Sequence, residues 1–101
     1  MDDIMLLIAV TTERDSKGVL RERETARQVF CRVKSIRQSE FFQAGRNGLN
    51  PEWQFTVFHA DYDGEEIVEY AGKRYKVYRT YHVPGTDDME IYTERRGGKN
   101  G

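Results

Sequence analysis

Apolar and polar residues alternate along most of the chain, and this period of two predicts a β-protein. Between residues 24 and 37, Val29, Cys31 and Val33 alternate with charged or aromatic residues, which predicts one long strand. A second alternating pattern, with aromatic residues on one face, predicts a strand over residues 53–59.

Four more segments have strand patterns: 4–14, 67–70, 75–83 and 89–94. The turns between strands are rich in Asp, Gly and Pro: 15–18, 61–66, 71–72 and 84–88. The regular spacing of about six strands predicts a small all-β domain over residues 1–94. We expect an antiparallel β-barrel with one short helix, because closure of the sheet removes exposed strand edges.

Residues 38–51 interrupt the strand pattern and form a long loop that contains the predicted helix. Ser39 is suited to cap its start, and Glu40 is suited to the positive end of the helix dipole. Gly45 or Gly48 is expected to end it after two turns at most.

Phe41 and Phe42 are adjacent in this helix, and Leu49 and Trp53 lie on either side of the Gly- and Asn-rich turn that follows. A monomer gains little from such side chains unless the core or a neighbouring molecule covers them. Two interpretations remain open: the rings plug one open end of the barrel, or they form assembly contacts. Both hold together if one ring points inward and the other outward.

At 101 residues, the chain is expected to form one domain. Its net charge of -1 argues against binding to nucleic acid through bulk charge alone. The single cysteine excludes an intramolecular disulfide and favours a reducing, intracellular origin. The apolar run 4–10 follows Asp2 and Asp3 rather than basic residues, and it is too short to span a membrane. We therefore expect a soluble protein without a membrane partner.

No motif for catalysis or for a cofactor is present in the sequence. His59 and His82 are predicted on different strands, without the spacing of a metal site. Asp61 and Asp63 lie in an acidic turn that lacks the other ligands of a calcium loop. Cys31 is interpreted as a small buried side chain, because no base accompanies it in a motif. We expect a protein that is not an enzyme and that needs no metal or cofactor.

A basic face is the strongest candidate for a binding surface. Its cations are Arg32, Lys34, Arg74 and Lys76, interleaved with the aromatic residues Phe30 and Tyr78. Such a face could serve as a platform for single-stranded nucleic acid, as in oligonucleotide-binding barrels. The alternative is an ordinary solvated strand face. A basic, flexible tail is expected over residues 95–101, with Arg95, Arg96 and Lys99 available to dock on an acidic partner.

The order of the segments resembles that of the small head-tail joining proteins of long-tailed bacteriophages, which are also called head-closure or stopper proteins. Two stretches carry most of the resemblance: residues 33–44, which include Ser-Glu-Phe-Phe, and residues 67–77, which include Tyr-Ala-Gly-Lys-Arg-Tyr. An aromatic strand lies between them, and a strand with Met-Glu-Ile-Tyr at residues 89–92 follows. The similarity covers residues 4–94.

The resemblance implies a non-enzymatic virion protein of a phage or prophage. Its copies form a ring, usually of twelve, between the portal and adaptor proteins on one side and the tail proteins on the other. The ring closes the DNA-filled head, and the protein touches the DNA in the channel without sequence specificity. The expected location is the virion connector, and the host cytoplasm during assembly. The channel or assembly residues implied in the loop are Ser39, Glu40, Phe41, Phe42 and Arg46.

The isolated protein is expected to be monomeric. Charged residues make up 33% of the chain and leave little continuous apolar surface. A free-standing nucleic-acid-binding barrel remains the alternative function. Affinity for DNA that falls steeply with salt would distinguish it from a connector protein.

Overall fold

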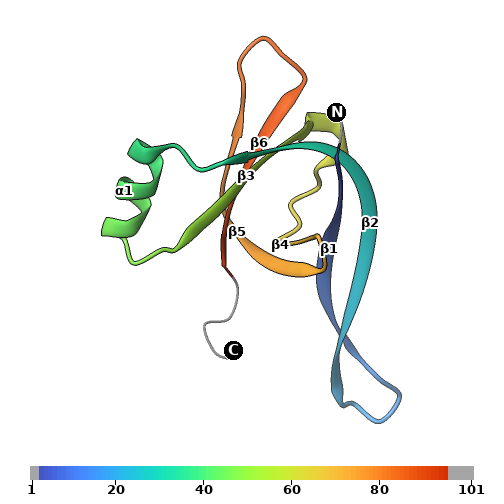
Figure 1. The fold of residues 1–101 in the computed structure, drawn as a ribbon. Helices are drawn as coiled ribbons and strands as arrows, with labels where there is room; N and C mark the ends of the chain where they lie inside the picture. Colours follow the sequence, from blue (N-terminus) through green and yellow to red (C-terminus); the bar gives the residue numbers. More distant parts are fainter. Residues whose placement is uncertain (1–2, 96–101) are drawn as a thin grey trace.

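Within residues 3–95, six segments form β-strands and one forms an α-helix (Figure 1). The computed structural model describes residues 3–95. The strands are β1 (Asp3–Arg14), β2 (Leu20–Ser35), β3 (Pro51–Phe58), β4 (Ile67–Tyr70), β5 (Lys73–His82) and β6 (Asp88–Arg95). The helix α1 (Gln38–Arg46) follows β2, and a short 3₁₀ helix, η1 (His59–Asp61), follows β3.

The strands form a closed ring in the order β1-β2-β3-β6-β5-β4, and every neighbouring pair is antiparallel. Residues 6–8 of β1 pair with residues 67–69 of β4 and close the ring. The predicted all-β antiparallel barrel with one short helix is confirmed. The order was not predicted: β6 follows the other strands in the chain but lies between β3 and β5.

The barrel core is built from alternate positions of five strands. Its buried members are Met5, Leu7, Val29, Cys31, Phe55, Val57, Val68 and Ile91. Phe55 is fully buried and lies against the rings of Tyr70 and Tyr75, with centroid distances of 5.4 and 6.5 Å. Each large apolar side chain buried in this way contributes about 1.5–3 kcal/mol relative to an exposed one. The aromatic face predicted for β3 is therefore its inner face.

Most strand boundaries differ from the predicted ones by one to four residues, and three of these differences change the interpretation. β2 begins at Leu20, four residues early, because pairing with β1 holds residues 20–23 in a strand, although the charged residues 21–23 contain no apolar signal. β3 ends at Phe58, so His59 belongs to η1 and not to a strand. Arg95 is the last residue of β6 and pairs with Tyr75, so it belongs to the barrel rather than to the tail.

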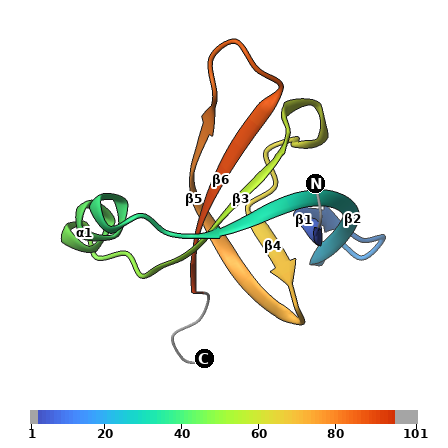
Figure 2. The same ribbon diagram turned by 45° about the horizontal axis from the view of Figure 1, so that its top comes forward.

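β1 and β2 continue beyond the barrel as a two-stranded hairpin, which we call the arm (residues 9–25). β1 pairs with β4 only at residues 6–8, and β2 pairs with β3 only at residues 32–35. The carboxylate of Asp15 holds the turn of the arm and accepts hydrogen bonds from the N–H groups of Lys17 and Val19, both at 2.9 Å. The arm and α1 extend from opposite sides of the barrel (Figures 1 and 2).

The predicted hairpin between β4 and β5 is confirmed, with a two-residue turn at Ala71 and Gly72. Both residues have positive φ, 52° and 78°. This is the pattern of a type I′ turn, which matches the twist of the flanking strands. Ala71 is the only residue other than glycine with positive φ among residues 3–95. Its backbone is therefore strained, because a side chain with a Cβ atom disfavours this conformation.

Candidate assembly site

The helix α1 occupies most of the predicted loop 38–51, on the connection between β2 and β3. It begins at Gln38 with Arg37 as its N-cap, and the N–H of Phe41 donates to the Arg37 carbonyl at 2.8 Å. The prediction that Ser39 caps the helix is wrong, since the chain leaves its extended conformation at Arg37 and Ser39 already lies in the first turn. With nine residues, α1 is also half a turn longer than predicted.

A Schellman motif ends the helix. The N–H of Gly48 donates to the Gly45 carbonyl at 3.0 Å, and the N–H of Leu49 donates to the Ala44 carbonyl at 3.1 Å. Gly48 has φ +81°, a conformation that suits glycine. Of the two glycines considered, Gly48 therefore ends the helix and Gly45 lies within it. Arg46 is exposed in the last turn, where a cation favours the negative end of the helix dipole.

Phe41 and Phe42 lie on the surface of α1. Their exposed fractions are 48% and 59%, and their rings meet edge to face with centroids 6.1 Å apart. Neither ring belongs to the core, and α1 lies beside the barrel rather than across its open end (Figure 1). The interpretation of these rings as a barrel plug is therefore wrong. They form an exposed apolar pair, which we call the phenylalanine pair.

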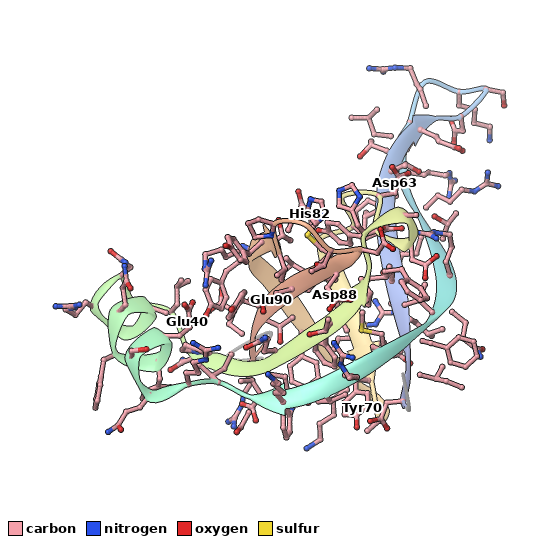
Figure 3. The ribbon with its side chains drawn as sticks, turned by 90° about the horizontal axis from the view of Figure 1, so that it is seen from above. Glu40, Asp63, Tyr70, His82, Asp88 and Glu90 are labelled. Atoms are coloured by element: carbon pink, nitrogen blue, oxygen red, sulfur yellow. The ribbon has the colours of Figure 1, made fainter. Side chains whose placement is uncertain are left out.

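Glu40 connects α1 to the barrel and lies on the side of the helix that faces β5 (Figure 3). Its carboxylate accepts a hydrogen bond from Tyr78 Oη at 2.7 Å and another from Arg79 Nη2 at 2.7 Å. The guanidinium of Arg79 lies 4.0 Å from the ring centroid of Tyr92, within the range of a cation–π contact. The Glu40 side chain is only 16% exposed. These four residues fix the position of the helix.

The charge states of this cluster follow from burial and hydrogen bonding. Burial raises the pKa of Glu40, but the hydrogen bonds from Arg79 and Tyr78 outweigh it and lower the pKa below its ordinary value. Burial, then the hydrogen bond to Glu40, raises the pKa of Tyr78. Burial and a hydrogen bond to Glu90 raise the pKa of Tyr92 to about 12. At neutral pH the carboxylate is therefore charged and both tyrosines are neutral donors.

An open groove of about 450 Å³ lies between α1 and β5. It is lined by Glu40, Gln43, Ala44, Asn47, Leu49, Tyr78 and Arg79. Polar and apolar side chains share its walls, in contrast to the mostly apolar lining of a typical small-molecule pocket.

Sequence reasoning missed the roles of Tyr78 and Arg79. Strict alternation placed these neighbours on opposite faces of β5. The register of β5 against β6 shifts between Val77 and Arg79, and this bulge allows both Tyr78 and Arg79 to reach Glu40. One signal was present: Glu40 is the only acidic residue between residues 25 and 51, so its carboxylate was a candidate for a specific partner.

The predicted basic face is divided between strands that are not neighbours. Its cations are Arg32 and Lys34 on β2, and Arg74 and Lys76 on β5. Other strands separate β2 from β5 on both sides of the ring. Arg32 contacts the carboxylate of Asp88 at 3.3 Å, and Arg74 contacts Glu24 at 2.8 Å and Glu69 at 3.2 Å. Two of the four charges are thus already compensated, and the structure brings no four-cation platform together.

Of the predicted docking residues of the tail, only Arg95 lies in the described part of the chain. Its guanidinium contacts Glu52 at 3.3 Å, and its N–H donates to the Asn50 carbonyl at 3.2 Å. Arg95 therefore secures the connection between α1 and β3. Arg96 and Lys99 lie outside the described residues.

The two histidines lie together, which the sequence did not indicate. The rings of His59 and His82 are stacked with centroids 4.2 Å apart, because η1 turns His59 back toward the end of β5. His82 Nε2 is 2.8 Å from the carbonyl of Thr86. Within residues 3–95, no group of three or more His, Cys, Asp or Glu side chains is arranged to hold a metal ion. We assign the stacked pair to the packing of the turn between β5 and β6, which contains Thr86.

Neither a family model nor a curated protein matches the chain. In the described part of the chain, no helix is long and apolar enough to cross a membrane.

Proposed function

We propose that this protein is a structural, non-enzymatic component of a phage or prophage connector, in which its copies form a ring that joins the head to the tail. The phenylalanine pair on α1 is the observation that carries the proposal. Glu40 connects the helix to β5 through hydrogen bonds with Tyr78 and Arg79, yet the helix presents two half-exposed aromatic rings away from the core. A surface that is both fixed in position and apolar is suited to contact with another protein.

The resemblance of residues 33–44 and 67–77 to head-tail joining proteins supports the same proposal. The partners are then other copies of this chain, twelve in a complete ring, with the portal and adaptor proteins on one side and tail proteins on the other. Arg46, exposed at the end of α1, faces the DNA in the channel or an acidic group of a neighbouring copy. The protein acts at the virion connector and is assembled in the host cytoplasm.

The alternative, a nucleic-acid-binding barrel, receives less support from the arrangement of charges. Arg32 and Arg74 already contact carboxylates of the same chain. A phosphate backbone would have to displace these partners, so each such contact yields less affinity than a free cation would. Phe30 is 60% exposed, but Tyr78, the second aromatic residue of the predicted platform, donates its hydroxyl to Glu40.

Electron microscopy of the protein mixed with portal and adaptor rings tests the role of the phenylalanine pair. Replacing both Phe41 and Phe42 with alanine should lower the fraction of connectors that carry a closing ring. The matched control is Phe58→Ala, which removes a phenylalanine that is 51% exposed on the barrel. Normal rings from the double variant would remove the main support for the proposal.

The role of Arg46 is tested by DNA retention in assembled particles. Arg46→Glu should impair retention or ring assembly without unfolding the protein, because the residue is exposed. Lys73→Glu, which reverses an exposed cation in the β4–β5 hairpin, is the control. An Arg46→Glu protein that assembles and retains DNA would contradict the channel assignment. Strong, salt-dependent binding of the isolated protein to DNA would favour the alternative function.

A further inference from the structure

The arm has two strand edges without partners among residues 3–95. β1 pairs on one side with β2 along its whole length, but on the other side it meets β4 only at residues 6–8. Likewise, β2 meets β3 only at residues 32–35. An isolated two-stranded hairpin is at most marginally stable in water, and its free N–H and C=O groups can pair with another strand. The arm is therefore incomplete as a sheet.

On each face of the arm, the charges on β1 are opposite in sign to the charges on β2. Residues directly opposite in an antiparallel pair share a face, so the register places Glu13 of β1 on the same face as Arg21 and Arg23 of β2. Arg14 of β1 lies on the other face, together with Glu22 of β2. On each face, β1 thus carries the sign opposite to that of β2.

This pattern favours one mode of pairing between copies. If the β1 edge of one arm meets the β2 edge of the next, Glu13 approaches Arg21 and Arg23 of the next copy, and Arg14 approaches Glu22. These contacts add to those within one arm, where Arg21 contacts Asp15 at 3.0 Å and Arg23 contacts Glu13 at 3.4 Å. An antiparallel two-fold pairing of β2 with β2 would bring Arg21 and Arg23 beside the same cations of the partner, and like charges in opposed positions are destabilising. Pairing of unlike edges is head-to-tail, and head-to-tail contacts generate rings when the rotation closes.

We propose that the arms of neighbouring copies pair edge to edge, β1 of one against β2 of the next, and form a continuous antiparallel sheet around the ring. The occupant of each free edge is a second copy of this chain. In a ring whose arms point the same way, β1 and the neighbouring β2 run in opposite directions, as an antiparallel ladder requires. Closure of such a sheet leaves no free edge. The inference rests on the proposed ring and adds the surface that joins its subunits.

Disulfide trapping between two single-cysteine variants tests the pairing on the protein alone at millimolar concentration. Glu13→Cys protein is mixed with Arg21→Cys protein, oxidised and analysed by mass spectrometry. Both sites are exposed, with side-chain exposures of 55% and 72%, whereas the native Cys31 is fully buried. Head-to-tail pairing predicts that mixed dimers exceed the share expected from random collision. An excess of either homodimer, or no dimer, would overturn the proposal.

Charge reversal supplies the second test. Arg23→Glu should lower the mixed-dimer yield roughly threefold, because an attractive cross-strand pair becomes a repulsive one. Adding Glu13→Arg, with the second trapping cysteine moved from residue 13 to Thr11 on the same face, should restore the yield. Residues 13 and 23 then regain opposite signs both between copies and within one arm, where the two side chains lie 3.4 Å apart. Failure of this rescue in a variant with unchanged thermal unfolding would also contradict the proposal.

The two proposals fail separately. Trapping is measured without portal or adaptor proteins. If mixed dimers form but the protein never binds a connector, the proposed function is refuted and the arm pairing is retained. Connector rings that form normally from protein with reversed charges in the arm would refute the arm pairing and retain the proposed function.

Discussion

Replacing Glu40 with alanine should loosen α1 and destabilise the protein by about 2 kcal/mol. The hydrogen bond from Tyr78 to a charged acceptor contributes about 1.5 kcal/mol. The ion pair with Arg79 adds about 0.5 kcal/mol, a value reduced for solvent screening because the Arg79 side chain is 43% exposed. Urea denaturation at neutral pH, followed by far-ultraviolet circular dichroism, measures the difference in the free energy of unfolding.

The pH dependence of this difference has a definite sign. The pKa of Glu40 is lower in the folded protein than its ordinary value of 4.5. The stabilisation is therefore fully present above about pH 4.5 and is lost as the pH falls through the lower, folded pKa. The gap between the wild type and Glu40→Ala should close in acid. Tyr78→Phe should add little to Glu40→Ala, because the two changes remove the same hydrogen bond.

Equal urea midpoints for the wild type and Glu40→Ala at neutral pH would show that α1 does not depend on this cluster. A gap that widens in acid would refute the charge assignment.

Three further predictions concern the barrel. Phe55→Ala should lower the free energy of unfolding by about 3–5 kcal/mol and Phe41→Ala by less than about 1 kcal/mol, because only the ring of Phe55 is fully buried. Equal shifts of the melting temperature for the two variants would contradict this. Ala71→Gly should raise the free energy of unfolding by about 0.5–1 kcal/mol. The gain is the backbone strain relieved at φ 52°, reduced by the larger conformational entropy that glycine gives the unfolded chain. An unchanged or lower melting temperature would count against it. Cys31 should resist iodoacetamide in the native protein at about pH 8 and react once the protein unfolds, since burial raises its pKa to about 11; rapid native labelling would refute this.

The strands could be predicted where apolar side chains alternate, as in β3, because burial on one face leaves a period of two in the sequence. Residues 21–23 had no such signal. Each has an exposed side chain, and their strand conformation comes from pairing with β1. The sequence also contained no information on which edges meet, so the position of β6 between β3 and β5 had to come from the structure.

The candidate site was predicted in part. The position of α1 and the exposure of Arg46 follow from a short helical segment beside a Gly-rich turn. The contact of Glu40 with Tyr78 and Arg79 depends on one bulge, whose extra residue changes which side chains share a face. Local irregularities of this kind decide long-range contacts and leave no mark on hydrophobic periodicity.

The central place of β6 has a consequence for the synthesis of the protein. β3 and β5 each pair with β6, so neither has this neighbour while β6 is still within the ribosome. The barrel therefore closes only after residue 95 has emerged, and earlier folding is limited to hairpins such as β1–β2 and β4–β5. A nascent chain of this protein has several open strand edges at once. The risk of aggregation during synthesis therefore depends on how quickly β6 leaves the ribosome and pairs with β3 and β5.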